Sequence, residues 1–206
     1  MDVFEAMWTT RSMRRLDPDR DVSDEDVRTI LEAALRGPTG GNQQPIRWLV
    51  IRDAETKRAL QKVYLRCWEK GRKPYEEKPG TVAPNVLSSA DHLADNLHLA
   101  PVIVIACACA GAGAGTSRRR QDASVYPSVQ NLLLAARALG LGTTLTTAHL
   151  LEEDTVKEIL DIPERVTTYA LIPVGYPTGR WGEAKRRPLD EVSYHDRWGR
   201  LGPSVR

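Results

Sequence analysis

The chain has 206 residues, of which 41% are hydrophobic and 27% charged, a length and composition typical of a single globular domain. Its formal net charge of +2 argues against a protein that binds nucleic acid or a membrane surface through a general excess of basic residues. The three cysteines are an odd number, and no apolar N-terminal segment resembles a signal peptide, so we expect a soluble protein of the reducing cytoplasm. The longest apolar run, residues 100–110, is too short to span a bilayer.

Capping residues and apolar patterns predict helices and strands in alternation. Asp2 and Ser23 each stand where a capping box begins, so both predict the start of a helix. Asp53 predicts the start of another helix, and Ser88 or Ser89 can cap a fourth. Two further helices are expected over residues 125–139 and 152–160, and strands over 46–51, 102–110 and 166–174, with a short β-prone segment at 142–147.

Residues 71–84 carry Pro74, Pro79, Gly80 and Pro84 among charged residues. We expect the chain to form a single domain over residues 1–206. Within it, the composition of residues 71–84 is more typical of a mobile excursion than of a core element. Such excursions often cover an active site, although a disordered insertion without a role has the same composition.

A loop rich in glycine, proline and amides follows the second predicted helix, reading G-P-T-G-G-N-Q-Q-P over residues 37–45. Its glycines permit positive φ and its prolines interrupt regular structure. Its hydroxyl and amide groups can meet a polar ring, although an ordinary surface turn has a similar composition.

Two short basic clusters border predicted core elements, at residues 11–15 and 185–187. If their side chains converge, they offer charge-assisted hydrogen bonds to a compact dianion such as a phosphate monoester. A polynucleotide would instead need a broader basic stripe with exposed aromatic residues. Together with the loop at 37–45 and the threonine-rich segment at 142–147, the clusters offer donors for a phosphate and for a heterocycle, which are the requirements of flavin mononucleotide.

Two other patterns point to less favoured sites. Gly111, Gly113 and Gly115 follow a predicted strand, but their spacing does not match a dinucleotide-binding fingerprint, and with the arginines at 118–120 they favour a flexible exposed loop. His92 and His98 lie six residues apart and point in different directions on a helix, so we expect no metal site.

Several motifs recur in an order that resembles the nitroreductase superfamily of FMN-dependent oxidoreductases. They are R-S-M-R at 11–14, P-T-G-G-N-Q-Q-P at 38–45, L-L-L-A-A-R-A-L-G-L-G at 132–142, V-G-Y-P at 174–177 and K-R-R-P-L at 185–189. The resemblance implies an α+β fold with a mostly antiparallel central sheet flanked by helices. It also implies an intertwined homodimer with two FMN sites at the interface.

The resemblance also implies which residues contact the flavin. Its phosphate and ribityl chain would be held from the N-terminal side by Arg11, Ser12 and Arg14, and from the C-terminal side by Lys185 and Arg187. The ring would be lined by Pro38, Thr39, Gly40, Asn42 and Gln44, with Leu145, Thr146, Thr147 and Ala148 near its N5 atom. Arg14 is the cation expected beside N1 and O2, and no separate catalytic acid or base is expected.

By the same resemblance, NADH or NADPH would reduce the flavin, which would then reduce a small electrophile such as a nitroaromatic, a quinone or a conjugated carbonyl in ping-pong fashion. One alternative is an offshoot of the fold that modifies its flavin or removes halogen from an aromatic compound. Another is a non-enzymatic flavin-binding redox sensor, for which residues 71–84 would contact a protein partner. Nucleic-acid binding through residues 118–120 is the least favoured alternative.

Overall fold

The computed structural model describes residues 1–109 and 118–201, with side chains from residue 121 onward in the second range. Its α-helices are α1 (Val3–Thr9), α2 (Asp24–Ala34), α3 (Ala54–Glu77), α4 (Pro84–Asn96), α5 (Arg118–Ala138) and α6 (Glu153–Ile159). Its strands are β1 (Ile46–Ile51), β2 (Val102–Cys109), β3 (Gly142–Thr143) and β4 (Val166–Gly175). The structure also contains short 3-10 helices, which are η1 (Gly40–Asn42), η2 (Leu97–Leu99), η3 (Ala148–Glu152) and η4 (Leu189–Glu191).

Local side-chain capping explains where the first three helices begin. The side chains of Asp2, Ser23 and Asp53 each accept the backbone N–H of the third residue after them. These bonds satisfy N–H groups that have no partner within the helix, so the three predicted helix starts are confirmed.

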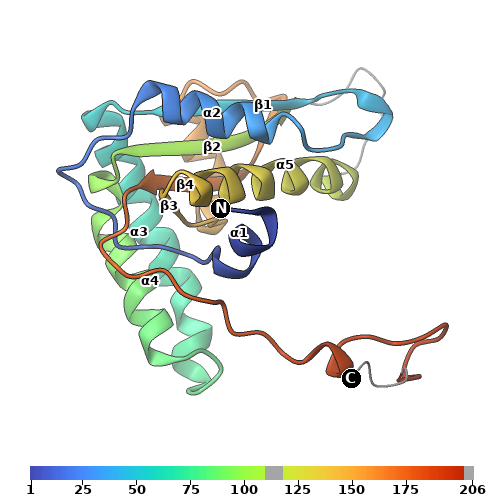
Figure 1. The fold of residues 1–206 in the computed structure, drawn as a ribbon. Helices are drawn as coiled ribbons and strands as arrows, with labels where there is room; N and C mark the ends of the chain where they lie inside the picture. The colour runs from blue at the N-terminus through green and yellow to red at the C-terminus, as the bar shows by residue number, and fades with distance from the viewer. Residues whose placement is uncertain (110–117, 202–206) are drawn as a thin grey trace.

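The four strands form one sheet in the order β1-β2-β4-β3, with every pair of neighbouring strands antiparallel (Figure 1). The register places Val104 of β2 between Val50 of β1 and Ile172 of β4. The predicted α+β fold with an antiparallel central sheet is therefore confirmed.

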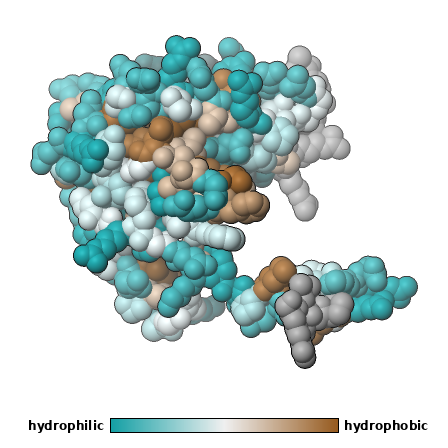
Figure 2. Space-filling model, viewed as in Figure 1, coloured by the Kyte–Doolittle hydropathy of each residue, from teal (hydrophilic) through white to brown (hydrophobic). Residues whose placement is uncertain are grey.

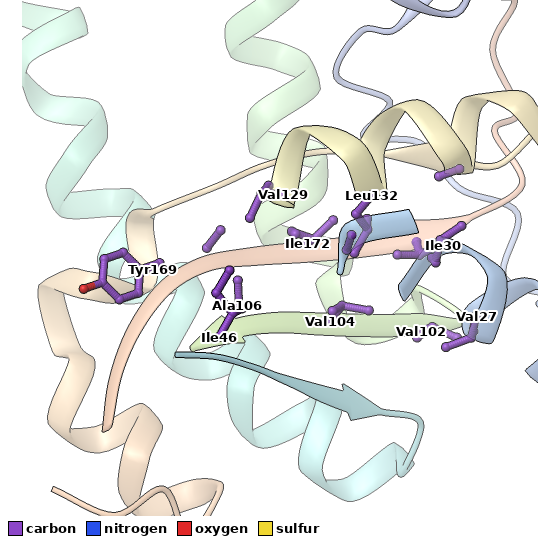
Figure 3. Packing of buried hydrophobic residues seen from close by; sticks show 14 of the residues in the cluster. Val27, Ile30, Ile46, Val102, Val104, Ala106, Val129, Leu132, Tyr169 and Ile172 are labelled. Atoms are coloured by element: carbon purple, nitrogen blue, oxygen red, sulfur yellow. The ribbon is translucent and has the colours of Figure 1, made fainter. Parts of the chain in front are cut away.

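The sheet is the middle of three layers, because helices cover both of its faces. Alternate residues of β2, such as Val104 and Ala106, face a core that includes residues of α2 and α5 (Figure 3). Ile103 and Ile105 face the opposite core, to which α3, α4 and α6 contribute. Burial on both faces explains why β2 reads as a continuous apolar run instead of an alternating one. None of the helices in the described ranges is both long enough and apolar enough to cross a membrane.

Three local predictions were wrong. Residues 71–77 are not an irregular excursion, because α3 continues through Pro74 to Glu77 and only the turn from 78 to 83 separates it from α4. α4 starts at Pro84, before either serine that was expected to cap it. Residues 118–120 form the start of α5 instead of a loop, whereas the glycines at 111–115 lie outside the described residues. The mobility of 71–84 stays a prediction.

The C-terminal segment extends away from the layered body after β4 (Figure 1). Its apolar side chains Leu189, Val192 and Trp198 are exposed, Trp198 to 91%. Apolar residues also gather on the face where α1 lies (Figure 2), where Phe4 and Trp8 are 61% and 63% exposed. Within the described residues, the side of α1 that carries Phe4 and Trp8 is therefore left largely exposed.

Candidate functional site

The N-terminal basic cluster lies beside β3. The Met13 N–H donates to the Thr143 carbonyl at 2.9 Å, and the Thr144 hydroxyl donates to the Met13 carbonyl at 2.9 Å. A backbone bridge also pairs Ser12 with Thr143. These bonds bring Arg14 next to the segment that contains Thr146, as the flavin-site prediction requires.

The C-terminal segment returns along the same N-terminal residues. The N–H of Thr178 donates to the Arg15 carbonyl at 3.1 Å, and the N–H of Ala184 donates to the Trp8 carbonyl at 3.0 Å. Arg11 Nη1 lies 3.8 Å from where a side-chain carbon at Gly182 would stand. The two basic clusters, at 11–15 and 185–187, therefore lie on the same side of the molecule.

A cavity of about 190 Å³ opens between Arg14, the segment that follows β3, and the hairpin formed by α3 and α4. Its floor is the segment from Thr144 to Thr146, and Arg14 stands at its wall. The hairpin contributes an aromatic and aliphatic wall that includes Tyr64, Trp68, Tyr75, Val82, Val86 and Leu87. Such a wall suits a flat apolar ring.

Arg14 is the one charged side chain among the described residues that line this cavity. Burial lowers the pKa of its guanidinium, and the nearby Tyr64 acts in the opposite direction. Within the described ranges, the Arg14 side chain has no hydrogen-bond or ion-pair partner. A half-buried cation without a counter-charge favours a bound anion, because partial desolvation strengthens its attraction for negative charge.

Tyr64 of α3 lines the cavity, although the sequence analysis did not name it as a site residue. Its side chain is 4% exposed, and its hydroxyl shares a 2.9 Å hydrogen bond with the Thr146 hydroxyl. Burial raises the pKa of Tyr64. The Thr146 hydroxyl also accepts the Ala148 N–H at 3.3 Å. A usable signal was present, because Tyr64, Trp68 and Tyr75 recur at spacings that place them on one helix face.

The loop at 37–45 is organised by its own polar groups. The Thr39 hydroxyl accepts the backbone N–H of Gln44 at 3.1 Å, and Asn42 Oδ1 accepts a hydrogen bond from Gln44 Nε2 at 3.1 Å. Asn42 and Gln44 both adopt positive φ, at 53° and 49°. The loop, which also contains Pro38 and Gly40, thus holds the polar side chains of Thr39, Asn42 and Gln44 in a defined arrangement, and its contact with a flavin stays a prediction.

This loop and Arg14 are not brought together within one chain. The Gly40 N–H contacts the Ser124 hydroxyl near the start of α5, whereas β3 follows the other end of that helix (Figure 1). At ~1.5 Å per residue, Ser124 and Ala138 are separated by about 20 Å along α5. The predicted site residues therefore fall into two groups, one at each end of this helix.

His92 forms a hydrogen bond with an arginine side chain. Its Nδ1 lies 2.9 Å from Arg15 Nη1, so the neutral imidazole accepts a hydrogen bond there. Burial, followed by the Arg15 charge, lowers the pKa of His92, and Asp95 opposes them. In the part of the chain that the structure describes, no group of three or more His, Cys, Asp or Glu residues is placed to hold a metal ion.

The similarity to known proteins extends over nearly the whole chain. A protein of Methanothermobacter thermautotrophicus named as an NADH dehydrogenase or NAD(P)H nitroreductase is 32% identical over 179 residues, which are 86% of this chain and 78% of the relative. An NADH dehydrogenase of Thermus thermophilus is 33% identical over 207 residues, covering 93% of this chain and 95% of the relative.

Among solved structures, a protein from Desulfovibrio desulfuricans described as a nitroreductase in complex with FMN has a TM-score of 0.70 and 29% identity, covering 96% of this chain and 98% of that one. The structure of iodotyrosine deiodinase bound to FMN and 3-iodo-L-tyrosine has a TM-score of 0.71, and the match covers 91% of this chain and 96% of that one. At 24% identity, this match shows only that the two proteins share a fold. A family model described as the Nitroreductase family matches residues 9–176, and the chain belongs to that family.

Proposed function

We propose that this protein is an FMN-dependent oxidoreductase that takes hydride from NADH or NADPH and reduces a small electrophile. The observation that carries the proposal is the Arg14 guanidinium, which lines an aromatic-walled cavity without a counter-charge among the described residues. The names of the relatives from Methanothermobacter and Thermus support a nicotinamide donor. The FMN in the Desulfovibrio structure supports the choice of flavin.

The donor set of the site fits FMN. Arg11, Ser12, Lys185 and Arg187 lie on one side of the molecule and would hold the phosphate and the ribityl chain. Arg14 would face the ring, where a cation stabilises the anion that a two-electron reduction produces. When bound, FMN supplies the redox chemistry that the side chains of the protein lack.

Thr146 would present its hydroxyl toward the ring, since Tyr64 and the Ala148 N–H already fix the position of its oxygen. Leu145, Thr147 and Ala148 would complete this side of the site. The apolar wall from α3 and α4 would exclude water and leave room for a flat electrophile such as a nitroaromatic or a quinone.

The same proposal includes a homodimer that completes the flavin site. In one protomer the loop packs near Ser124, about 20 Å along α5 from the end of the helix beside which Arg14 lies; the loop residues concerned are Pro38, Thr39, Gly40, Asn42 and Gln44. A second copy could supply the loop. The exposed apolar face of α1 and the extended C-terminal segment offer surface for such an association (Figure 2).

The proposal is tested by the visible absorption spectrum of the purified protein, recorded without oxygen before and after addition of NADPH and then NADH. A flavin spectrum that bleaches with either donor is expected, and the faster donor is the preferred one. Turnover with a nitroaromatic or a quinone should then follow ping-pong kinetics. No flavin binding, even after reconstitution with FMN, would refute the proposal.

Reductive removal of halogen is the second candidate, because the chain shares its fold with iodotyrosine deiodinase. Release of iodide from 3-iodotyrosine by the reduced protein would favour this candidate. A flavin spectrum that persists with both nicotinamide donors would instead favour a redox sensor.

A further inference from the structure

Asp91 joins the two helices that wall the cavity. Its Oδ1 accepts the Trp68 indole N–H at 2.8 Å and the Arg72 Nε–H at 2.9 Å, and its Oδ2 lies 3.4 Å from Arg72 Nη2. Asp91 belongs to α4, whereas Trp68 and Arg72 belong to α3. One carboxylate therefore ties the two helices together and also fixes one aromatic side chain.

That aromatic side chain faces the proposed substrate. Trp68 lines the cavity, and Asp91 is a direct neighbour in sequence of Ala90, which also lines it. A half-buried indole N–H usually has a hydrogen-bond partner, and losing that partner favours a rotation that exposes the N–H to water. Such a rotation would move the largest ring of the cavity wall, so the position of the wall depends on Asp91.

We propose that Asp91 is a positioning residue that holds the Trp68 indole in the cavity wall and thereby sets the affinity for the electrophile. The proposal rests on the proposed function and concerns the same cavity. Asp91 acts through Trp68 and does not line the cavity itself. Its removal should therefore affect substrate affinity more than turnover or FMN binding.

The test compares four forms of the FMN-loaded protein: wild type, Asp91→Ala, Trp68→Phe and the double variant. Asp91→Ala is expected to raise KM for a quinone about tenfold, as loss of one charge-assisted hydrogen bond implies, with kcat changed by less than about twofold. Trp68→Phe keeps a ring in the wall but removes the donor. If Asp91 acts through the indole, Asp91→Ala should change KM little in the Trp68→Phe background. A full tenfold effect in that background would overturn the proposal.

Two matched variants test whether Asp91 acts by orienting the Trp68 indole or only by holding α3 and α4 together. Arg72→Gln removes the ion pair with Asp91 but leaves the bond from Trp68. Asp95→Ala makes the same change one turn further along α4, at an exposed position. Both are expected to keep KM within about twofold of wild type, because the Trp68 bond is the one that matters. A tenfold rise of KM in Arg72→Gln would show that tethering is the role, which would overturn the proposal.

A second readout does not depend on activity. The indole N–H resonance of Trp68, assigned by its absence in Trp68→Phe, should exchange slowly with deuterium in wild type and Arg72→Gln, and much faster in Asp91→Ala. Equal exchange in wild type and Asp91→Ala would refute the positioning role. If the wild type bound no flavin and oxidised no nicotinamide, the proposed function would fail, and the exchange rates would still decide whether Asp91 holds the indole.

Discussion

At the scale of single residues, Tyr64 and Thr146 form the polar contact beneath the cavity. Their hydroxyls lie 2.9 Å apart, and Tyr64 is 4% exposed. Tyr64→Phe should lower the free energy of unfolding by about 1 kcal/mol, because it removes one partner and leaves the ring in place. Thr146→Val should lower the free energy of unfolding by a larger amount, since the Thr146 hydroxyl also accepts the Ala148 N–H. Urea denaturation of the two variants measures both effects.

The double variant tests whether the two hydroxyls act as a pair. In a double-mutant cycle, Tyr64→Phe and Thr146→Val should show a coupling energy of about 1 kcal/mol, because either substitution alone already breaks their hydrogen bond. Additive losses, with no coupling, would mean that the hydroxyls do not contact each other in solution.

His92 should make the free energy of unfolding depend on pH, and the direction follows from the groups around it. Burial and the Arg15 charge lower its pKa below the ordinary value of 6.5, so the unfolded chain takes up the proton first as the pH falls. The stability from this group is thus fully present above pH 6.5 and decreases as the pH falls toward the folded-state pKa. His92→Asn, which keeps an acceptor for Arg15 but does not titrate, should lose less stability than wild type between about pH 7 and 5.

The control for this prediction is His195→Asn, because His195 is an exposed histidine of the C-terminal segment. Its free energy of unfolding should follow that of wild type across the same pH range. Thermal unfolding at each pH measures all three proteins. A His92→Asn variant whose stability falls as steeply as that of wild type would contradict the assignment.

At the scale of elements, the last turns of α3 depend on contacts that are distant in sequence. Pro74 removes one helical hydrogen bond, yet α3 continues to Glu77 because Arg72 and Trp68 bind Asp91 of α4. Sequence patterns located the helix starts at Asp2, Ser23 and Asp53, whose signals are local. They could not locate the end of α3, because proline and glycine read locally as breakers while the compensating partner lies on another helix.

The same distinction holds for the candidate site. The clusters at 11–15 and 185–187 are visible in the sequence because their basic residues are adjacent, and the structure places both clusters on one side of the molecule. Tyr64 and Asp91 were missed because their roles depend on partners 82 and 23 residues away, Thr146 and Trp68. Spacing within a helix can suggest a face, but only the packing of the helices decides what that face contacts.

Gly71 tests the helical end of α3 directly. A side-chain carbon there would meet nothing within 4 Å, and its φ is not positive. Gly71→Ala should therefore raise the free energy of unfolding by about 0.5–1 kcal/mol, the usual gain of alanine over glycine within a helix. Gly80→Ala in the following turn should be destabilising instead, because Gly80 has a φ of +89°. Urea midpoints separate the two outcomes, and a destabilised Gly71→Ala would mean that residues 71–77 are not helical in solution.

At the scale of the whole molecule, the predicted flavin contacts lie at both ends of α5. Arg14 and Thr146 stand near β3, whereas the loop at 37–45 contacts Ser124 near the start of the helix. About 20 Å of α5 lies between the positions beside which the two groups pack, and the proposed homodimer would bring one group from each copy into a shared site. The sequence motifs name both groups as candidates, but the chain order of motifs does not reveal which protomer supplies each one.

Mixed dimers test this arrangement. Arg14→Ala removes the cation, and Gly41→Val disrupts the loop, since Gly41 has a φ of +60° that valine does not readily adopt. Each variant alone should have little NAD(P)H-dependent reductase activity. In a heterodimer isolated with two different affinity tags, one site would carry both defects and the other neither, so about half of the wild-type activity per dimer is expected. If both groups served one site from the same protomer, each site of the heterodimer would carry one defect, and the mixed dimer would remain inactive.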